Sequence, residues 1–205
     1  MTLPPCYSWS PVGQNLLVPY EAPQGRRVNA LGGYLSHGPD AGTFRYAAYA
    51  GLPGGKGRKR RKPLSEVAAS HGLTEAQTGP ITGDRLAAFL WLLAGRPEDA
   101  PPDWKRARPL WVVLDNYSVH KGQPVREAVP GLEAAGIRLF YLPAYSPHLS
   151  AIEPVWHAIK HHEMPKRSHA GVADLLRAVE GALARKAEAL RAKHAETKDS
   201  LGTTT

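Results

Sequence analysis

Two short apolar segments in the second half of the chain constrain its fold more than any other feature. PLWVVLDN occupies 109–116 and IRLFYLP occupies 137–143. Apolar runs of this length, rich in β-branched and aromatic residues, are typical of strands buried on both faces. The segment VREAVPGLEAAG between them predicts a weaker helix, interrupted at Pro130. Strand, helix and strand in this order predict two parallel strands joined by a crossover.

The remaining segments complete an α/β pattern. Short apolar runs broken by Gly and Pro predict two or three strands in a meander: LLVPY at 16–20, VNALGGYL at 28–35 and TFRYAAYA at 43–50. Apolar residues at helical spacing predict a helix over 83–95 with one buried face. Further helices are expected from Glu153 onward and over 171–205, where the last turns should fray.

An excess of positive charge narrows the classes of partner. The 205 residues have a formal net charge of +8, which favours binding to phosphate backbones or acidic surfaces. One run between glycines is especially basic and contains Lys56, Arg58, Lys59, Arg60, Arg61 and Lys62. This run is either a solvated linker or a strap against the DNA backbone.

The lengths of the apolar stretches and the number of cysteines exclude several classes of protein. No stretch approaches the roughly 18 apolar residues of a membrane span, and the first residues lack the pattern of a signal peptide. Cys6 is the single cysteine, which excludes an internal disulfide and a zinc site built on paired thiols. We therefore expect a cytoplasmic protein with no membrane partner.

Two acidic residues follow the predicted parallel strands. Asp115 ends the first strand and Glu153 comes shortly after the second. Ligand groups gather outside the carboxyl ends of parallel strands, so the two carboxylates could converge there. Each acid also has a structural interpretation, because Asp115 could begin a turn and Glu153 could form a capping box with Ser150. The spacing alone leaves these alternatives open.

The residues around both acids carry a more specific signal. They match, at fixed offsets, the DDE superendonuclease domain of mariner-like bacterial insertion-sequence transposases, which the chain resembles over roughly 7–170. The matching positions are Asp115, Asn116, His120, Leu142, Pro143, Tyr145, Ser146, Pro147, Ile152, Glu153 and Trp156. YSWSPVGQ at 7–14 also looks like a strand of that family. The chain departs from the family at 148–151, where His-Leu-Ser-Ala replaces Asp-Leu-Asn-Pro.

The resemblance implies a ribonuclease H-like fold, in which helices flank a mixed sheet. It also implies metal-dependent DNA cleavage and strand transfer at the nucleoid, with transposon ends and target DNA as partners. Asp115 and Glu153 would be the catalytic residues and the ligands of two Mg²⁺ or Mn²⁺ ions, because hard cations prefer oxygen ligands. On this basis 1–170 form a partial catalytic domain, and 171–205 form a C-terminal helix and tail.

The family's third acid lies on a strand before YSWSPVGQ, a position that this chain does not reach. Glu21 and Asp40 match no family position. We therefore expect a truncated or split gene product that lacks the first strand and the first catalytic Asp. An upstream transposase segment carrying that Asp and a helix-turn-helix is the implied partner, and a homodimer is another candidate. A catalytically inactive DNA-binding or regulatory remnant is the alternative function.

Several single residues are interpreted separately. His120 is either a general acid or phosphate contact, or a structural histidine of the turn. Together with Lys121 and Lys160 it completes the predicted DNA contacts. Trp156 is expected to be a core anchor. A solvated face, rather than a metal site, is expected for His157, His161 and His162.

Overall fold

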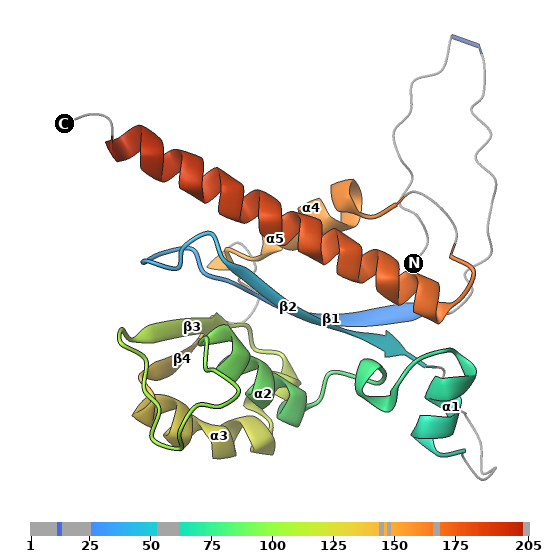
Figure 1. Cartoon of the computed structure of the whole chain (residues 1–205), viewed down its shortest axis with the longest axis horizontal. Coiled ribbons are helices and arrows are strands. Elements are labelled where there is room, and N and C mark those ends of the chain that lie inside the picture. Colours follow the sequence, from blue (N-terminus) through green and yellow to red (C-terminus); the bar gives the residue numbers. More distant parts are fainter. Residues whose placement is uncertain are drawn as a thin grey trace.

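A computed structural model gives the architecture of the chain (Figure 1). It describes residues 12–13, 26–52, 62–143, 146, 149–165 and 169–202. The strands are β1 (Arg27–Tyr34), β2 (Phe44–Gly51), β3 (Leu110–Leu114) and β4 (Ile137–Tyr141). The α-helices are α1 (Leu64–Ser70), α2 (Gly83–Leu93), α3 (Gln123–Ala134), α4 (Glu153–Ala158) and α5 (Val172–Gly202). Shorter helical turns are η1 (Glu75–Gln77), η2 (Ser118–Lys121) and the π-helical η4 (Ile159–Glu163).

Strands β1 and β2 form an antiparallel hairpin that is covered on both faces. Neighbouring side chains of a strand point to opposite faces. Ala47 and Tyr49 of β2 therefore pack against the core around α2, whereas Phe44 and Ala50 pack beneath α4 and α5. Figure 1 shows α5 and α2 on opposite sides of the hairpin. The two predicted strands at 28–35 and 43–50 are confirmed.

The β3–α3–β4 unit confirms the predicted parallel pair and its crossover. The pairing runs in parallel from Leu110 opposite Ile137, and α3 connects the two strands. The expected interruption at Pro130 is wrong, because α3 continues through this residue. Pro130 lies on the exposed side of the helix, and the buried Leu132 follows it. Packing of the apolar side of α3 thus outweighs the loss of one backbone hydrogen bond.

Helix α2 joins the two strand pairs through one core. Its buried residues are Leu86, Phe89, Leu90 and Leu93, as the helical spacing predicted. They form one apolar cluster with residues of both strand pairs, including Leu31 and Val112. The pairings of the described residues give two separate two-stranded sheets, β1–β2 and β3–β4. The protein is therefore mixed α/β, as expected, although these pairings do not join into one mixed sheet.

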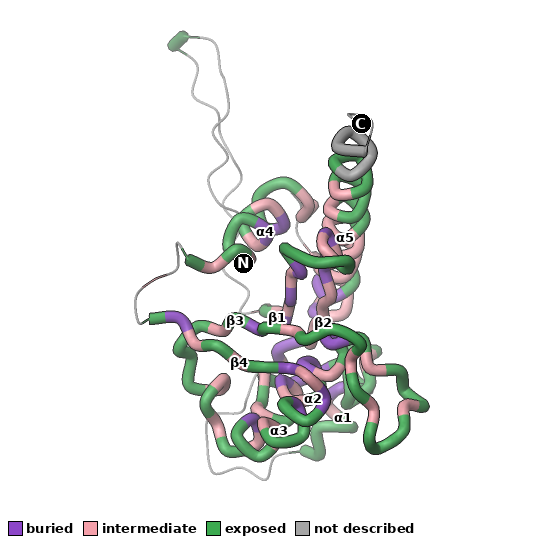
Figure 2. The backbone as a smooth tube through the Cα atoms, turned by 90° about the vertical axis from the view of Figure 1, so that its left-hand side faces the viewer, coloured by how far each residue is buried: buried purple, intermediate pink, exposed green. Residues whose placement is uncertain are grey.

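The expectation that β3 and β4 are buried on both faces is wrong. Val112 and Ile137 are buried in the core that contains α2 and α3. On the opposite face Trp111 is 60% exposed, and Val113 and Phe140 are each 53% exposed (Figure 2). An apolar run shows that a strand can be buried, but it does not show how many layers cover it. In the described residues helices cover only one face of this pair.

The described part of the chain after Glu153 is mostly helical, as predicted. The helix expected from Glu153 begins as α4 and continues as the π-helical η4. Helix α5 then runs along the hairpin and buries Leu176 and Leu183. No helix in the described ranges is both long and apolar enough to span a bilayer. The predicted strand LLVPY and the residues 56–61 of the basic run lie outside the described residues.

Helix α4 is anchored on the hairpin by Trp156. Its ring meets Phe44 edge-on, with 5.9 Å between the ring centroids. Gly32 of β1 provides the space, since a Cβ placed there would lie 2.6 Å from Trp156 Cζ2. The prediction that Trp156 is a core anchor is confirmed.

We expect Gly32→Ala to destabilise the protein, because the new methyl group displaces Trp156 and Phe44. Overpacking of this kind costs about 1–3 kcal/mol, which thermal unfolding followed by circular dichroism will measure. Gly131→Ala is the matched control, because Gly131 lies inside α3 and a Cβ there would meet only Trp91, at 3.6 Å. That variant should gain roughly 0.5–1 kcal/mol. Equal stability of the two variants would contradict the proposed packing.

Candidate active site

Asp115 stands directly after β3, where the strand gives way to a turn. An Asp-Asn pair after an apolar strand favours this geometry, since the Asp side chain can accept a hydrogen bond from the backbone two residues on. The Tyr117 backbone N–H donates to Asp115 Oδ1 over 2.9 Å. The carboxylate nevertheless remains 65% exposed. The turn interpretation of Asp115 is therefore correct, and it leaves the carboxylate accessible.

His120 holds the same carboxylate from the other side of the turn. Its Nδ1 lies 2.7 Å from Asp115 Oδ1 and 3.2 Å from the Asp115 carbonyl oxygen. The His120 side chain is only 17% exposed, and its ring meets Tyr117 edge-on. Nδ1 is thus engaged with Asp115. The interpretation of His120 as a structural histidine of the turn agrees with these contacts. Its role as a general acid or phosphate contact stays a prediction.

Two further contacts tie this turn to β4. The Asn116 side-chain amide donates to the Leu142 carbonyl oxygen, just past the end of β4. The Tyr141 hydroxyl donates to the His120 carbonyl oxygen over 2.9 Å. Burial raises the pKa of Tyr141, since desolvation disfavours the phenolate, so the hydroxyl remains a donor at neutral pH. The sequence interpretation missed Tyr141, although its place at the end of the second predicted strand was a usable signal.

Glu153 is the first residue of α4. The alternative interpretation of Glu153, a capping box with Ser150, does not hold, because the helix N-cap is Ile152 and has no side-chain cap hydrogen bond. Ser150 instead accepts a hydrogen bond at its backbone carbonyl from the Glu153 backbone N–H, over 3.2 Å. The Glu153 side chain is exposed. It is therefore available for a ligand, on a helix whose position is fixed by Trp156.

The structure brings some predicted site residues together and leaves others apart. Asp115 and His120 are in contact, and Lys121 Nζ lies 5.3 Å from the centre of the Tyr141 ring beside them. In the described ranges no three His, Cys, Asp or Glu residues lie close enough to hold a metal ion. The convergence of Asp115 and Glu153 therefore stays a prediction. Asp40 is engaged elsewhere, in an ion pair with Arg106.

The predicted DNA-binding cations have different surroundings. Lys56, Arg58, Lys59, Arg60 and Arg61 lie outside the described residues. Lys62 pairs with Glu66 at 2.6 Å, and this hydrogen bond raises the pKa of the Lys62 ammonium group. Lys160 is exposed on η4.

The histidines at the end of α4 form the exposed face that the sequence predicted. The rings of His157 and His161 lie 4.4 Å apart between centroids, and His162 lies 6.2 Å from His157. A metal site here is not supported by the described residues.

Comparison with known proteins identifies the family. Residues 74–176, about half of the chain, match the model of the DDE superfamily endonuclease family. The chain belongs to the DDE superfamily of endonucleases. It is also similar to the "Insertion element IS630 uncharacterized 39 kDa protein" of Shigella sonnei, with 30% identity over 66 residues. That match covers 32% of this chain and 18% of the relative. The DDE match contains both Asp115 and Glu153, and the resemblance inferred from the sequence is confirmed.

In this member of the DDE superfamily we expect Asn116→Ala to destabilise the fold, because the Leu142 carbonyl loses its side-chain donor. The loss of a hydrogen bond at this junction should cost about 1–2 kcal/mol. Urea unfolding will measure it. Gln123→Ala is the matched control, because its side chain makes an exposed hydrogen bond to Glu127 within one helix. If both variants unfold at the same urea concentration, Asn116 does not join the ends of β3 and β4.

Proposed function

We propose that this chain carries out metal-dependent cleavage and strand transfer of insertion-sequence DNA. The observation that carries the proposal is the Asp115 turn: an exposed carboxylate at the carboxyl end of β3, with Oδ1 bound by Tyr117 and His120. The exposure of this carboxylate leaves it accessible to a ligand. Its place within the DDE superfamily match supports the same conclusion. The proposal includes a ribonuclease H-like arrangement, with 1–170 as the catalytic domain and 171–205 as a C-terminal extension.

Two carboxylates of this chain are suitable ligands for a divalent metal ion, although they are fewer than the family chemistry uses. Endonucleases of this superfamily generally use such ions, and carboxylate oxygens are the ligands that Mg²⁺ and Mn²⁺ prefer. Asp115 Oδ2 and the exposed Glu153 carboxylate would be the ligands supplied by this chain. Bound there, two metal ions would stabilise charge on the attacking and leaving oxygens of an in-line phosphodiester displacement.

The other residues of the site have supporting roles. His120 and the Tyr117 backbone both contact Oδ1 of Asp115 and so restrict the rotation of its carboxylate. Asn116 and Tyr141 hold the turn against β4 and thereby maintain the direction of the carboxylate. Lys121 and Lys160 are exposed cations that would contact DNA phosphates near the site. The basic run from Lys56 to Lys62 would add contacts along the backbone of the transposon ends and target.

Two carboxylates are fewer than the family chemistry uses, so we propose that the third comes from an upstream transposase segment. That segment would also supply sequence-specific recognition of the element's ends through a helix-turn-helix. A homodimer would place two such sites on two DNA ends. The protein would work in the cytoplasm, on the nucleoid.

A catalytically inactive DNA-binding protein is the second candidate. It is favoured by the observation that no three potential metal ligands come together in the described part of the chain. The positive charge would still hold the protein on DNA. The two candidates differ in one measurable property, the dependence of strand cleavage on Asp115 and Glu153.

We expect Asp115→Asn and Glu153→Gln to lower nicking of supercoiled plasmid DNA in Mn²⁺ by at least about 100-fold, because each removes a charged ligand. The assay is run on the chain alone and with a co-purified upstream segment. Asp99→Asn and Glu133→Gln are the matched controls, since both acids are exposed and distant in sequence from the site. Parent-like nicking by the Asp115 and Glu153 variants would refute the site. DNA binding without any nicking would support the inactive candidate.

Replacing His120 tests whether it positions the carboxylate. We expect His120→Ala to reduce nicking about 10- to 100-fold, as for other groups that orient a ligand, and to raise the Mn²⁺ concentration needed for half-maximal rate. His120→Asn should restore much of the activity, because its amide can donate close to the Nδ1 position. If His120 only stabilises the fold, the His120→Ala variant will have a lower melting temperature but an unchanged Mn²⁺ requirement.

A further inference from the structure

A second candidate binding site lies at the other end of β3 from Asp115. A pocket of about 530 Å³ opens between the C-terminal end of α2, the beginning of β2 and the segment 104–108. Four cations line it, namely Arg45, Lys105, Arg106 and Arg108. One carboxylate, that of Asp40, lies in the same wall. We call this site the cation pocket.

Arg106 is the structural member of the cation pocket. Its guanidinium donates to the carbonyl oxygen of Ala94 at the end of α2, and to Asp40 Oδ2 over 2.9 Å. Its Nε donates to the Arg108 carbonyl oxygen over 3.2 Å. These bonds use the side-chain donors of Arg106. Its positive charge neutralises both Asp40 and the negative end of the α2 dipole. Among the described residues of the wall, Asp40 is the one carboxylate, so the other three cations have no compensating carboxylate there.

Arg45 is the least satisfied of these cations. Its Nε is buried, and no acceptor in the described part of the chain bonds it. A buried donor without a partner costs about 1–3 kcal/mol, so a bound acceptor would recover free energy here. Lys105 and Arg108 are exposed and form no ion pair with any described carboxylate. These three cations therefore favour an anion.

The backbone of the pocket leaves room for that anion. Gly95 follows α2 with a φ of +77°, a conformation that favours glycine. A Cβ at this position would lie 3.3 Å from Arg45 Nη2 and would narrow the pocket. Trp104 forms part of the wall and is held edge-on against Trp91, with 6.5 Å between centroids. An aromatic ring beside several cations suits a ligand that joins phosphate to a ring or sugar.

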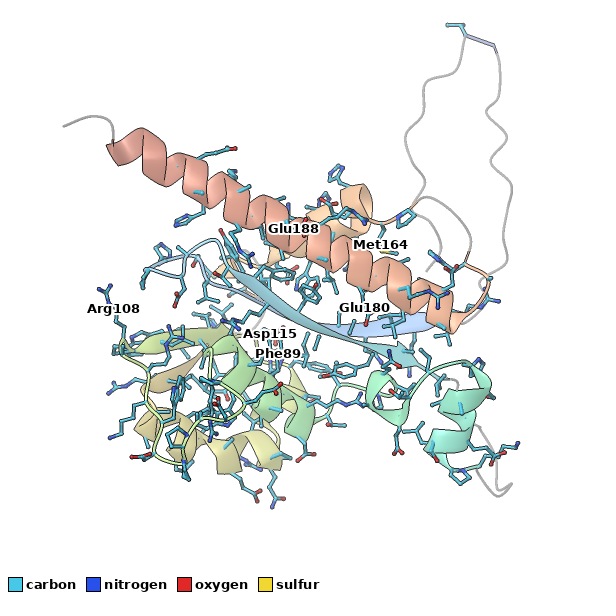
Figure 3. The ribbon with its side chains drawn as sticks, in the orientation of Figure 1. Phe89, Arg108, Asp115, Met164, Glu180 and Glu188 are labelled. Carbon is cyan, nitrogen blue, oxygen red and sulfur yellow. The ribbon has the colours of Figure 1, made fainter. Side chains whose placement is uncertain are left out.

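The position of the pocket relates it to the proposed cleavage site. Arg108 precedes β3 and Asp115 follows it, and Figure 3 shows the two residues at opposite ends of the strand. At about 3.3 Å per residue the two are at most roughly 23 Å apart. A DNA strand advances about 3.4 Å per nucleotide, so the separation corresponds to at most roughly seven nucleotides.

We propose that the cation pocket binds a backbone phosphate of the DNA whose cleavage takes place at Asp115. This inference rests on the proposed function, because the DNA path begins at that site. Arginines also gather at helix C-termini for electrostatic reasons alone. Arg106 alone satisfies the C-terminal end of α2 through its bond to the Ala94 carbonyl. The Nε of Arg45 donates to no described carbonyl of the helix, so Arg45 is not explained in this way.

The test uses the full chain and a double variant, Lys105→Ala/Arg108→Ala, in which both residues are exposed. Fluorescence anisotropy measures the affinity for a labelled duplex of about 20 base pairs between about 50 and 200 mM salt. We expect binding to weaken about 10-fold, and the slope of log affinity against log salt to become shallower by about 1, because the variant loses the one phosphate that the pocket holds. Arg191→Ala/Lys193→Ala on α5 is the matched control, because it removes the same charge from exposed positions.

Equal affinities and equal salt slopes for the two double variants would overturn the proposal, since only total charge would then matter. A separate arm adds inorganic phosphate and follows the melting temperature. If phosphate stabilises the parent and the control, but not the Lys105→Ala/Arg108→Ala variant, while DNA affinity is the same for both double variants, the pocket takes a free phosphate and the DNA assignment fails.

The outcome of the DNA-binding measurement does not depend on whether the protein cleaves DNA. Binding is measured without a metal ion, so a failure of the nicking assay leaves the salt slopes interpretable. Conversely, if nicking depends on Asp115 while the pocket variant binds like its control, the proposed function stands and this inference fails.

Discussion

The core around α2 is the constraint on which the rest of the structure depends. Leu86, Phe89, Leu90 and Leu93 fill one cluster that receives side chains from both strand pairs. Two-stranded sheets are marginal by themselves, so each pair depends on this helix for burial of one face. The helix also determines where its own C-terminal end lies, and the cation pocket forms at that end. Both candidate sites thus depend on the same packing.

Different interactions maintain the direction of each functional group. Asp115 is held by short-range bonds within its turn, from the Tyr117 backbone and the His120 ring. Glu153 is placed by a long-range contact, because α4 rests on the hairpin through Trp156 at Gly32. The two acids are therefore positioned by different contacts, although both depend on the core that the hairpin and β3 share.

The exposed apolar face of β3–β4 and the unsatisfied Arg45 Nε are features that cost this fold free energy. Trp111, Val113 and Phe140 would contribute more to stability if a further layer covered them. Proteins retain such features where a partner or ligand compensates for them. Under the proposed function, an upstream segment and a nucleic acid would offer both kinds of compensation.

The sequence by itself determined the local elements, the parallel pair and the candidate acids. The spacing of apolar residues and the order of strand, helix and strand suffice to predict these features, because both patterns depend on residues that are close in the chain. The residues around Asp115 and Glu153 also sufficed to recognise the family. Only the tertiary structure decided that helices cover one face of β3–β4, that Pro130 leaves α3 intact, and that Glu153 lacks a cap. Arg45, Lys105 and Arg108 meet at one pocket although some 60 residues separate the first from the others. Such long-range proximity depends on packing between elements, which no local pattern encodes.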